Sequence, residues 1–175
     1  MRGPVRSVSL FMLALTACAP KPKPTRAALD DSAFRAVQAR GRNVMGVDQY
    51  TSAHVFEDLP DGGRIVLDRA EPGDSAGIAT IRAHMRDIAA NFTRGDFTRP
   101  FAVHATAVPG AATMAAMKDR IRYQTIDRPA GAEVRIHTGD ATAVKAVHEF
   151  LAFQRSDHRA AGHEEMNHSA HSAPP

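Results

Sequence analysis

Histidine and methionine are the side chains of this chain whose types and spacing best support chemistry. The sequence holds nine histidines and seven methionines, but only one cysteine, at position 18. Imidazole is a good ligand for copper, zinc and nickel, and the methionine thioether selects copper(I). We therefore expect histidine to lead any metal site, with copper or zinc as the cofactor.

One group of candidate ligands lies at the C-terminal end. It comprises His158, His163, His168 and His171, with Met166 between them. Residues 160–175 show no apolar periodicity, which predicts a disordered tail. Such a tail would chelate metal loosely without a preformed site. The alternative is a solvated tail whose histidines have no role, and the sequence does not decide between the two.

A second candidate site lies in the folded part of the chain. His148, Gln154 and His158 fall on or beside the buried stripe of a predicted helix. Polar residues at buried positions often mark a site. We predict that these residues, joined by His104 or His54 from neighbouring strands, bind a metal or an anionic ligand. The alternative is a helix that reaches solvent at its end, where polar residues carry no desolvation cost.

Catalysis has less support in the sequence. Ser52 with His54, or Ser156 with Asp157 and His158, are residue types suited to nucleophilic attack. A working triad needs groups that converge beside an oxyanion hole, and the chain has no G-x-S-x-G motif. We therefore predict non-catalytic binding first, a structural or protein-interaction module second, and a small hydrolase or transferase third.

The elements that must position these side chains follow one order twice, with two strands joined by a turn and then a helix. They are predicted at 51–57, 64–68 and 74–93 in the first unit, and at 120–126, 133–137 and 140–158 in the second. With Asp74 laid on Asp140, both helices carry a stripe at steps of three and four residues. This pattern favours an internal duplication, although two ordinary amphipathic helices would look alike by chance.

The predicted fold class is α+β. The pseudo-duplicated strand–strand–helix units form one antiparallel sheet with two main helices on one face. Residues 28–159 make a single domain, which opens with a short helix at 28–40. Between the two units, 101–104 is predicted as an extra edge strand and 111–118 as a helical turn or two. Met85 is expected in the core, where methionine is a common filler, and His84 at its margin.

The N-terminal residues indicate where the protein works. Arg2 and Arg6 precede a short apolar stretch, which is the layout of a secretory signal over residues 1–17. The run Leu-Thr-Ala-Cys at 15–18 resembles the lipobox of bacterial lipoproteins. The resemblance implies cleavage before Cys18 and attachment of lipid to it. The alternative is a plain secretory signal in which the cysteine falls there by chance.

A lipidated Cys18 would hold the protein at a membrane. Residues 18–27 alternate proline with lysine and are predicted to form an extended tether. The expected location is the periplasmic side of the cell envelope. Ala19 stands where an aspartate would signal inner-membrane retention in enteric bacteria, which by analogy favours the outer membrane.

Charge and cysteine content exclude several classes of partner and chemistry. The net charge is +3, and two of the basic residues lie in the signal. The other basic residues are interspersed with acidic ones, which argues against nucleic-acid binding. The folded part has no cysteine, so disulfides and thiolate sites are excluded there. The expected partners are the membrane, through lipid on Cys18, and an envelope protein.

Several short segments between residues 43 and 160 also carry a likeness to one protein family. They are Met45-Gly46-Val47-Asp48-Gln49, Asp61-Gly62-Gly63, Gly95-Asp96-Phe97, Pro109-Gly110, the run from His148 to Gln154, and Asp157-His158. Through them the chain resembles a family of short, uncharacterised secreted bacterial proteins. Some members carry the automatically assigned name aspartate carbamoyltransferase. The Ser-Thr-Arg-Thr loop and His-Pro motif of those transferases are absent here, so the resemblance implies no mechanism.

Overall fold

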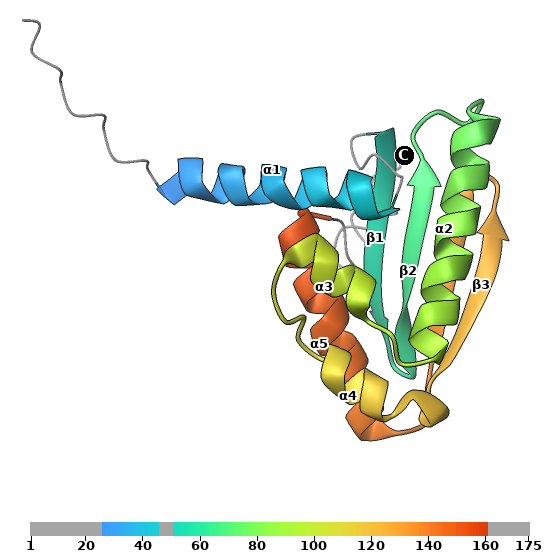
Figure 1. Cartoon of the computed structure of the whole chain (residues 1–175). Helices are drawn as coiled ribbons and strands as arrows, with labels where there is room; N and C mark the ends of the chain where they lie inside the picture. Colours follow the sequence, from blue (N-terminus) through green and yellow to red (C-terminus); the bar gives the residue numbers. More distant parts are fainter. Residues whose placement is uncertain (1–25, 46–50, 161–175) are drawn as a thin grey trace, which may run out of the picture.

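One antiparallel sheet of four strands carries the helices of an α+β domain (Figure 1). The computed structural model describes residues 26–45 and 51–160. The strand order is β1-β2-β4-β3. The strands are β1 (Ser52–Leu59), β2 (Gly62–Arg69), β3 (Arg122–Arg128) and β4 (Gly131–His137). The predicted class is confirmed, whereas duplication of the strand–strand–helix unit stays a prediction.

Helices precede, separate and follow the two hairpins. They are α1 (Arg26–Met45), α2 (Ser75–Thr93), α3 (Thr98–His104), α4 (Ala111–Ala116), the 3₁₀ turn η2 (Lys118–Arg120) and α5 (Ala141–His158). The two main helices begin where the sequence places them. The Asp74 carboxylate accepts from the backbone N–H of Gly77 at 2.9 Å. The Asp140 carboxylate accepts from the N–H of Thr142, also at 2.9 Å. Each aspartate thus caps a helix whose first N–H groups lack intrahelical partners.

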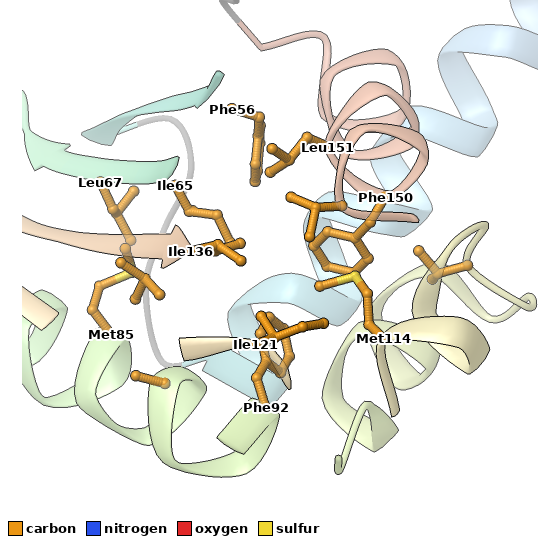
Figure 2. Packing of buried hydrophobic residues seen from close by; sticks show 14 of the residues in the cluster. Phe56, Ile65, Leu67, Met85, Phe92, Met114, Ile121, Ile136, Phe150 and Leu151 are labelled. Carbon is orange, nitrogen blue, oxygen red and sulfur yellow. The ribbon is translucent and has the colours of Figure 1, made fainter. Parts of the chain in front are cut away.

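The core lies between the sheet and the two main helices. Alternate strand residues point to one face, and on that face Ile65, Leu67 and Ile136 are almost fully buried. Figure 2 shows side chains from the sheet meeting Phe92 of α2 and Phe150 of α5 in one cluster. Both helices therefore cover the same face of the sheet, as predicted.

Each main helix crosses onto the hairpin of the other unit. Helix α2 packs chiefly on β3 and β4 and also touches β2, while α5 packs on β1 and β2. Figure 1 shows α2 near β3 and α5 near β1, toward opposite edges of the sheet. Neither hairpin is covered by the helix that directly follows it. As a result, residues of the first unit contact residues of the second unit throughout the core.

Two predictions about the connecting segments are wrong. Residues 101–104, predicted as an edge strand, belong to helix α3. The Asp96 side chain accepts from the N–H of Thr98 at 2.9 Å, and Pro100 falls in the first helical turn, where no N–H is needed. A four-residue apolar run does not distinguish strand from helix. The helix predicted at 28–40 is longer and begins at Arg26, within the expected tether.

Helix α1 lies across α3 and α5, and its N-terminal part extends away from the other elements (Figure 1). The Arg40 guanidinium donates to the carbonyl oxygen of Val103 at 2.6 Å, at the C-terminal end of α3. The Arg159 guanidinium lies 4.4 Å from the ring centroid of Phe34. Within the described residues, no helix is long and apolar enough to cross a membrane. Cys18 and the signal lie outside those residues.

Candidate functional site

A cavity of about 60 Å³ lies between the sheet, α2, α3 and α5. Four elements each contribute a histidine to its described lining, namely His54 from β1, His84 from α2, His104 from α3 and His158 from α5. The other lining residues are mostly apolar, among them Phe56, Leu67, Met85, Phe92 and Phe150. One water needs about 10–15 Å³ of such space. The cavity therefore has room for an ion or a few waters, but not for a bulky organic ligand.

Strand alternation and helix periodicity direct these rings inward. His54 lies two residues before Phe56 and pairs across the hairpin with Leu67, so all three face the helices. The rings of His54 and His158 stack, with centroids 5.6 Å apart and planes 11° from parallel. The Phe56 ring stacks on His158 at 5.7 Å. The β1 hairpin and the end of α5 therefore form one wall of the cavity.

His104 is held from both sides by α5. Its Nδ1–H donates to the Asp157 carboxylate, and a hydrogen bond of 2.9 Å joins its Nε2 to the side-chain amide of Gln154. The His104 ring stands edge-on to His158, at 5.0 Å between centroids. Both nitrogens of His104 are thus engaged, and the residue fastens α3 to α5.

Burial keeps three of the four imidazoles neutral near pH 7. Desolvation lowers the pKa of His54 to about 4, helped by the nearby His84. Desolvation also lowers the pKa of His84 to about 4, and the Arg99 cation adds to the effect. The pKa of His158 falls to about 3, first through burial and then through His54 and His104. A neutral imidazole keeps one nitrogen lone pair, which can accept a proton or bind a metal.

Two of these buried rings present a nitrogen that lacks a hydrogen bond. Among the described residues, nothing pairs with Nδ1 of His54 or with Nδ1 of His84. A buried polar atom left in this way costs about 1–3 kcal/mol. Such atoms are uncommon in folded proteins and call for a water, an ion or a ligand. Both nitrogens belong to residues that line the same cavity.

Charged groups stand beside the cavity where α2 and α3 meet. Arg99, which lines the cavity, forms an ion pair of 3.2 Å with Asp87. More than a third of each side chain is exposed, so this pair lies at the surface. Arg99 lowers the pKa of His84 and Asp87 raises it. The pair thus sets the charge next to His84.

The structure brings together most of the site predicted within the domain. His158, Gln154, His104 and His54 meet at the cavity. Gln154 and His158 are both about 5 % exposed. The alternative prediction, a helix end that simply reaches solvent, is therefore wrong. The helix end is buried because α3 packs over it.

His148 and the tail residues do not join this group. The Nε2–H of His148 donates to the carbonyl oxygen of Leu59 at 2.9 Å, and His148 is absent from the cavity lining. Its role in this structure is to tie α5 to the end of β1. The remaining predicted ligands lie outside the described residues, namely His163, Met166, His168 and His171.

Two participants, His84 and Asp157, were not assigned to this site from the sequence. His84 lies three residues after Ile81 and four before Ile88, which places it on the buried stripe of α2. That spacing was visible, but the crossing of α2 toward α5 was not. Asp157 precedes His158 in sequence, and only its contact with α3 reveals that it orients His104.

The residue types at the cavity limit which metals would fit. Within residues 26–45 and 51–160, no three His, Cys, Asp or Glu side chains are arranged to hold a metal ion. A closed zinc centre commonly uses four such ligands. No centre of that kind stands ready-made in this part of the chain.

No protein-family model, curated protein or solved structure matches this chain. The functional inference therefore rests on the geometry and chemistry of the cavity.

Proposed function

We propose that this protein is a cell-envelope lipoprotein that binds a transition metal without catalysing a reaction. The proposed binding site is the histidine-lined cavity. The observation that carries the proposal is the pair of buried, unpartnered nitrogens, Nδ1 of His54 and Nδ1 of His84. Both rings are neutral near pH 7, which is the form that binds metal.

The composition of the cavity favours binding over covalent catalysis. The described residues that line it include no Ser, Thr, Cys or Lys that would act as a nucleophile. The pair formed by Asp157 and His104 has the types of a catalytic dyad. However, the second nitrogen of His104 is hydrogen-bonded to Gln154, so it does not face a substrate.

The sequence supports the location. Lipidation at Cys18 would anchor the chain permanently, because several acyl chains act together. Helix α1 begins at Arg26, so only a short segment separates this helix from the anchor. A metal-binding domain held close to a membrane would act on metal within the envelope.

Metal titration of the full chain in detergent tests the proposal. Copper(I), copper(II) and zinc are each titrated against a competing chelator. To exclude metal binding by the tail, His163, Met166, His168 and His171 are replaced with alanine, which gives the tail variant. We expect about one ion per chain in this tail variant, and loss of binding when His54 and His84 are also changed to alanine.

A matched control uses a histidine outside the cavity. His148→Ala, in the same tail variant, should leave metal affinity unchanged. The proposal fails if the tail variant binds none of the three metals. It fails equally if the double change His54→Ala with His84→Ala leaves the affinity as it was.

A second candidate function is docking of an envelope protein. Phe101 on α3 is 56 % exposed and borders an apolar groove that Phe97, Val108 and Ala112 also line. An exposed aromatic beside such a groove is typical of a contact surface. Specific crosslinking of one envelope protein to the native chain, abolished by Phe101→Ser, would favour this function.

A further inference from the structure

We infer that the ion held in the cavity is copper(I), bound by Nδ1 of His54, Nδ1 of His84 and the thioether of Met85. This assignment rests on the proposed function and adds the identity of the metal, its oxidation state and a third ligand. The apolar stripe of α2 favours Met85 as a core residue, with a soft copper(I) ligand as the alternative.

Met85 belongs to both the core and the cavity. It follows His84 directly on α2, is 1 % exposed and lines the cavity together with His54 and His84. Figure 2 shows Met85 on α2 facing the sheet residue Leu67, which is the cross-strand partner of His54. The three proposed ligands therefore come from two elements, β1 and α2, that both border the cavity.

The donor set matches copper(I) better than its competitors. Two neutral imidazoles and a thioether carry no negative charge, and thioether sulfur selects copper(I). Zinc commonly takes four ligands, and its structural sites favour thiolates. Copper(II) prefers a tetragonal arrangement of nitrogen and oxygen. Copper(I) accepts two or three ligands, which is the number that His54, His84 and Met85 would supply.

The walls of the cavity favour a singly charged ion as well. Apolar side chains such as Phe56, Leu67 and Phe92 surround the site. Moving an ion from water into such surroundings is costly, and the Born penalty grows with the square of its charge. A monovalent ion with neutral ligands therefore loses less hydration energy than a divalent ion would. The Arg99 cation beside His84 also opposes a second positive charge.

The other two histidines have different tasks. His104 uses both nitrogens in hydrogen bonds to Asp157 and Gln154, so it positions α3 as a wall. His158 stacks on His54 and fixes the plane of that ring. The main rival to copper is one water molecule that donates to both unpartnered nitrogens.

The experiment compares substitutions at two buried methionines, Met85 and Met114. Each is made in the full chain that carries the alanine substitutions in the tail. Met85→Leu removes the proposed sulfur ligand while nearly preserving volume. Met114→Leu is the control, since Met114 is fully buried but does not line the cavity. Copper(I) affinity is measured anaerobically by competition with a chromophoric chelator. We expect at least about tenfold weaker binding for Met85→Leu, equivalent to about 1.4 kcal/mol, and no change for Met114→Leu.

X-ray absorption at the copper edge of the tail variant, in which His54, His84 and Met85 are unchanged, gives a readout that does not depend on the leucine variants folding. We expect nitrogen scatterers together with one sulfur scatterer. Tighter binding of zinc or copper(II), a spectrum without sulfur, or equal affinities of the two leucine variants would overturn the copper(I) assignment alone. Absence of binding by all three metals would instead overturn the proposed function itself.

Discussion

Two ring pairs at corresponding positions show how similar placements of a helix and a strand hold either apolar rings or imidazoles beside one cavity. Phe92 and His158 each lie 18 residues after the aspartate that caps their helix. Tyr123 and His54 each lie six residues before the proline of their hairpin turn. Because the helices cross, Phe92 meets Tyr123 at 5.7 Å between ring centroids, and His158 meets His54 at 5.6 Å.

The difference lies in the side chains rather than in the backbone. The pair of Phe92 and Tyr123 joins α2 to β3 through two aromatic rings, of which Phe92 lines the cavity. The pair of His158 and His54 occupies the matching place between α5 and β1, and both of its rings are imidazoles that line the cavity. Buried imidazoles weaken a fold that apolar rings would strengthen. Imidazoles form the pair between α5 and β1 but not the pair between α2 and β3. We expect such a difference where a binding site is built into a fold that apolar packing otherwise stabilises.

The largest effect expected from this difference is on acid stability. The pKa values of His54 and His84 are lowered to about 4, and that of His158 to about 3, from an ordinary 6.5. The contribution of these histidines to the free energy of unfolding is fully present above pH 6.5. It is lost as the pH falls toward 4, because the unfolded chain takes up protons there and the folded chain does not. Each group accounts for up to about 3 kcal/mol. We predict that urea denaturation shows a loss of at least about 5 kcal/mol between pH 7 and pH 4.5.

The carboxylates do not share this window. The pKa values of Asp74 and Asp140 lie below the ordinary 3.8. Protonation of these carboxylates therefore lowers the free energy of unfolding only at a more acidic pH. His158→Phe, which copies the residue at the other end, should therefore flatten the curve above pH 4.5. An unchanged slope in His158→Phe would contradict the assignment.

Truncation of each ring at pH 8 should separate the two ends. Phe92→Ala removes a ring that is 1 % exposed and contacts Phe97, Tyr123 and Phe150. We predict a loss of about 3–5 kcal/mol in the free energy of unfolding. His158→Ala should cost less than half as much, because its removal only enlarges an existing cavity. Equal losses in chemical denaturation would show that both ends are packed alike.

Replacing Gln154 should weaken the fold even where the new residue is apolar. Gln154 takes the stripe position of Ile88 when the two helices are aligned. Gln154→Ile leaves Nε2 of His104 without its partner, and we predict a loss of about 1–3 kcal/mol. Gln154→Glu, which keeps an acceptor oxygen, is the companion variant. A gain in stability for Gln154→Ile would mean that the hydrogen bond to His104 contributes nothing.

The smallest effect is expected on the solvent face of α5. Lys145 and Glu149 form an exposed i,i+4 pair at 3.8 Å. Surface pairs of this kind contribute about 0.5 kcal/mol or less. Lys145→Ala should therefore shift the denaturation midpoint only slightly. A larger shift would reveal a contact on this face that the structure does not show.

Local signals were enough to predict most of the fold. The turns at 60–61 and 129–130, the caps at Asp74 and Asp140, and the helical stripes all act within a few residues. Such features are written in neighbouring side chains. The same signals failed for α3, because its apolar run is too short to show a period.

The site was harder to predict because its residues meet only through the crossing of the helices. Gln154 and His158 were named from polar positions on an otherwise apolar stripe, and His54 and His104 as neighbours from predicted strands. His148 lies about three turns before His158 on the same helix, but it donates to Leu59 and does not enter the cavity. His84 sits on a stripe indistinguishable from ordinary core until α2 is laid over the sheet.

The crossed helices also set the order in which the cavity can exist. The first strand–strand–helix unit supplies His54 and His84, but α2 of that unit packs on β3 and β4, which come later in the chain. Helix α5 is the last described element and brings Gln154 and His158. Before α5 is in place, the cavity lacks the wall formed by Gln154 and His158, and His54 lacks the ring that stacks on it. Metal binding would then follow the docking of α5 rather than precede it.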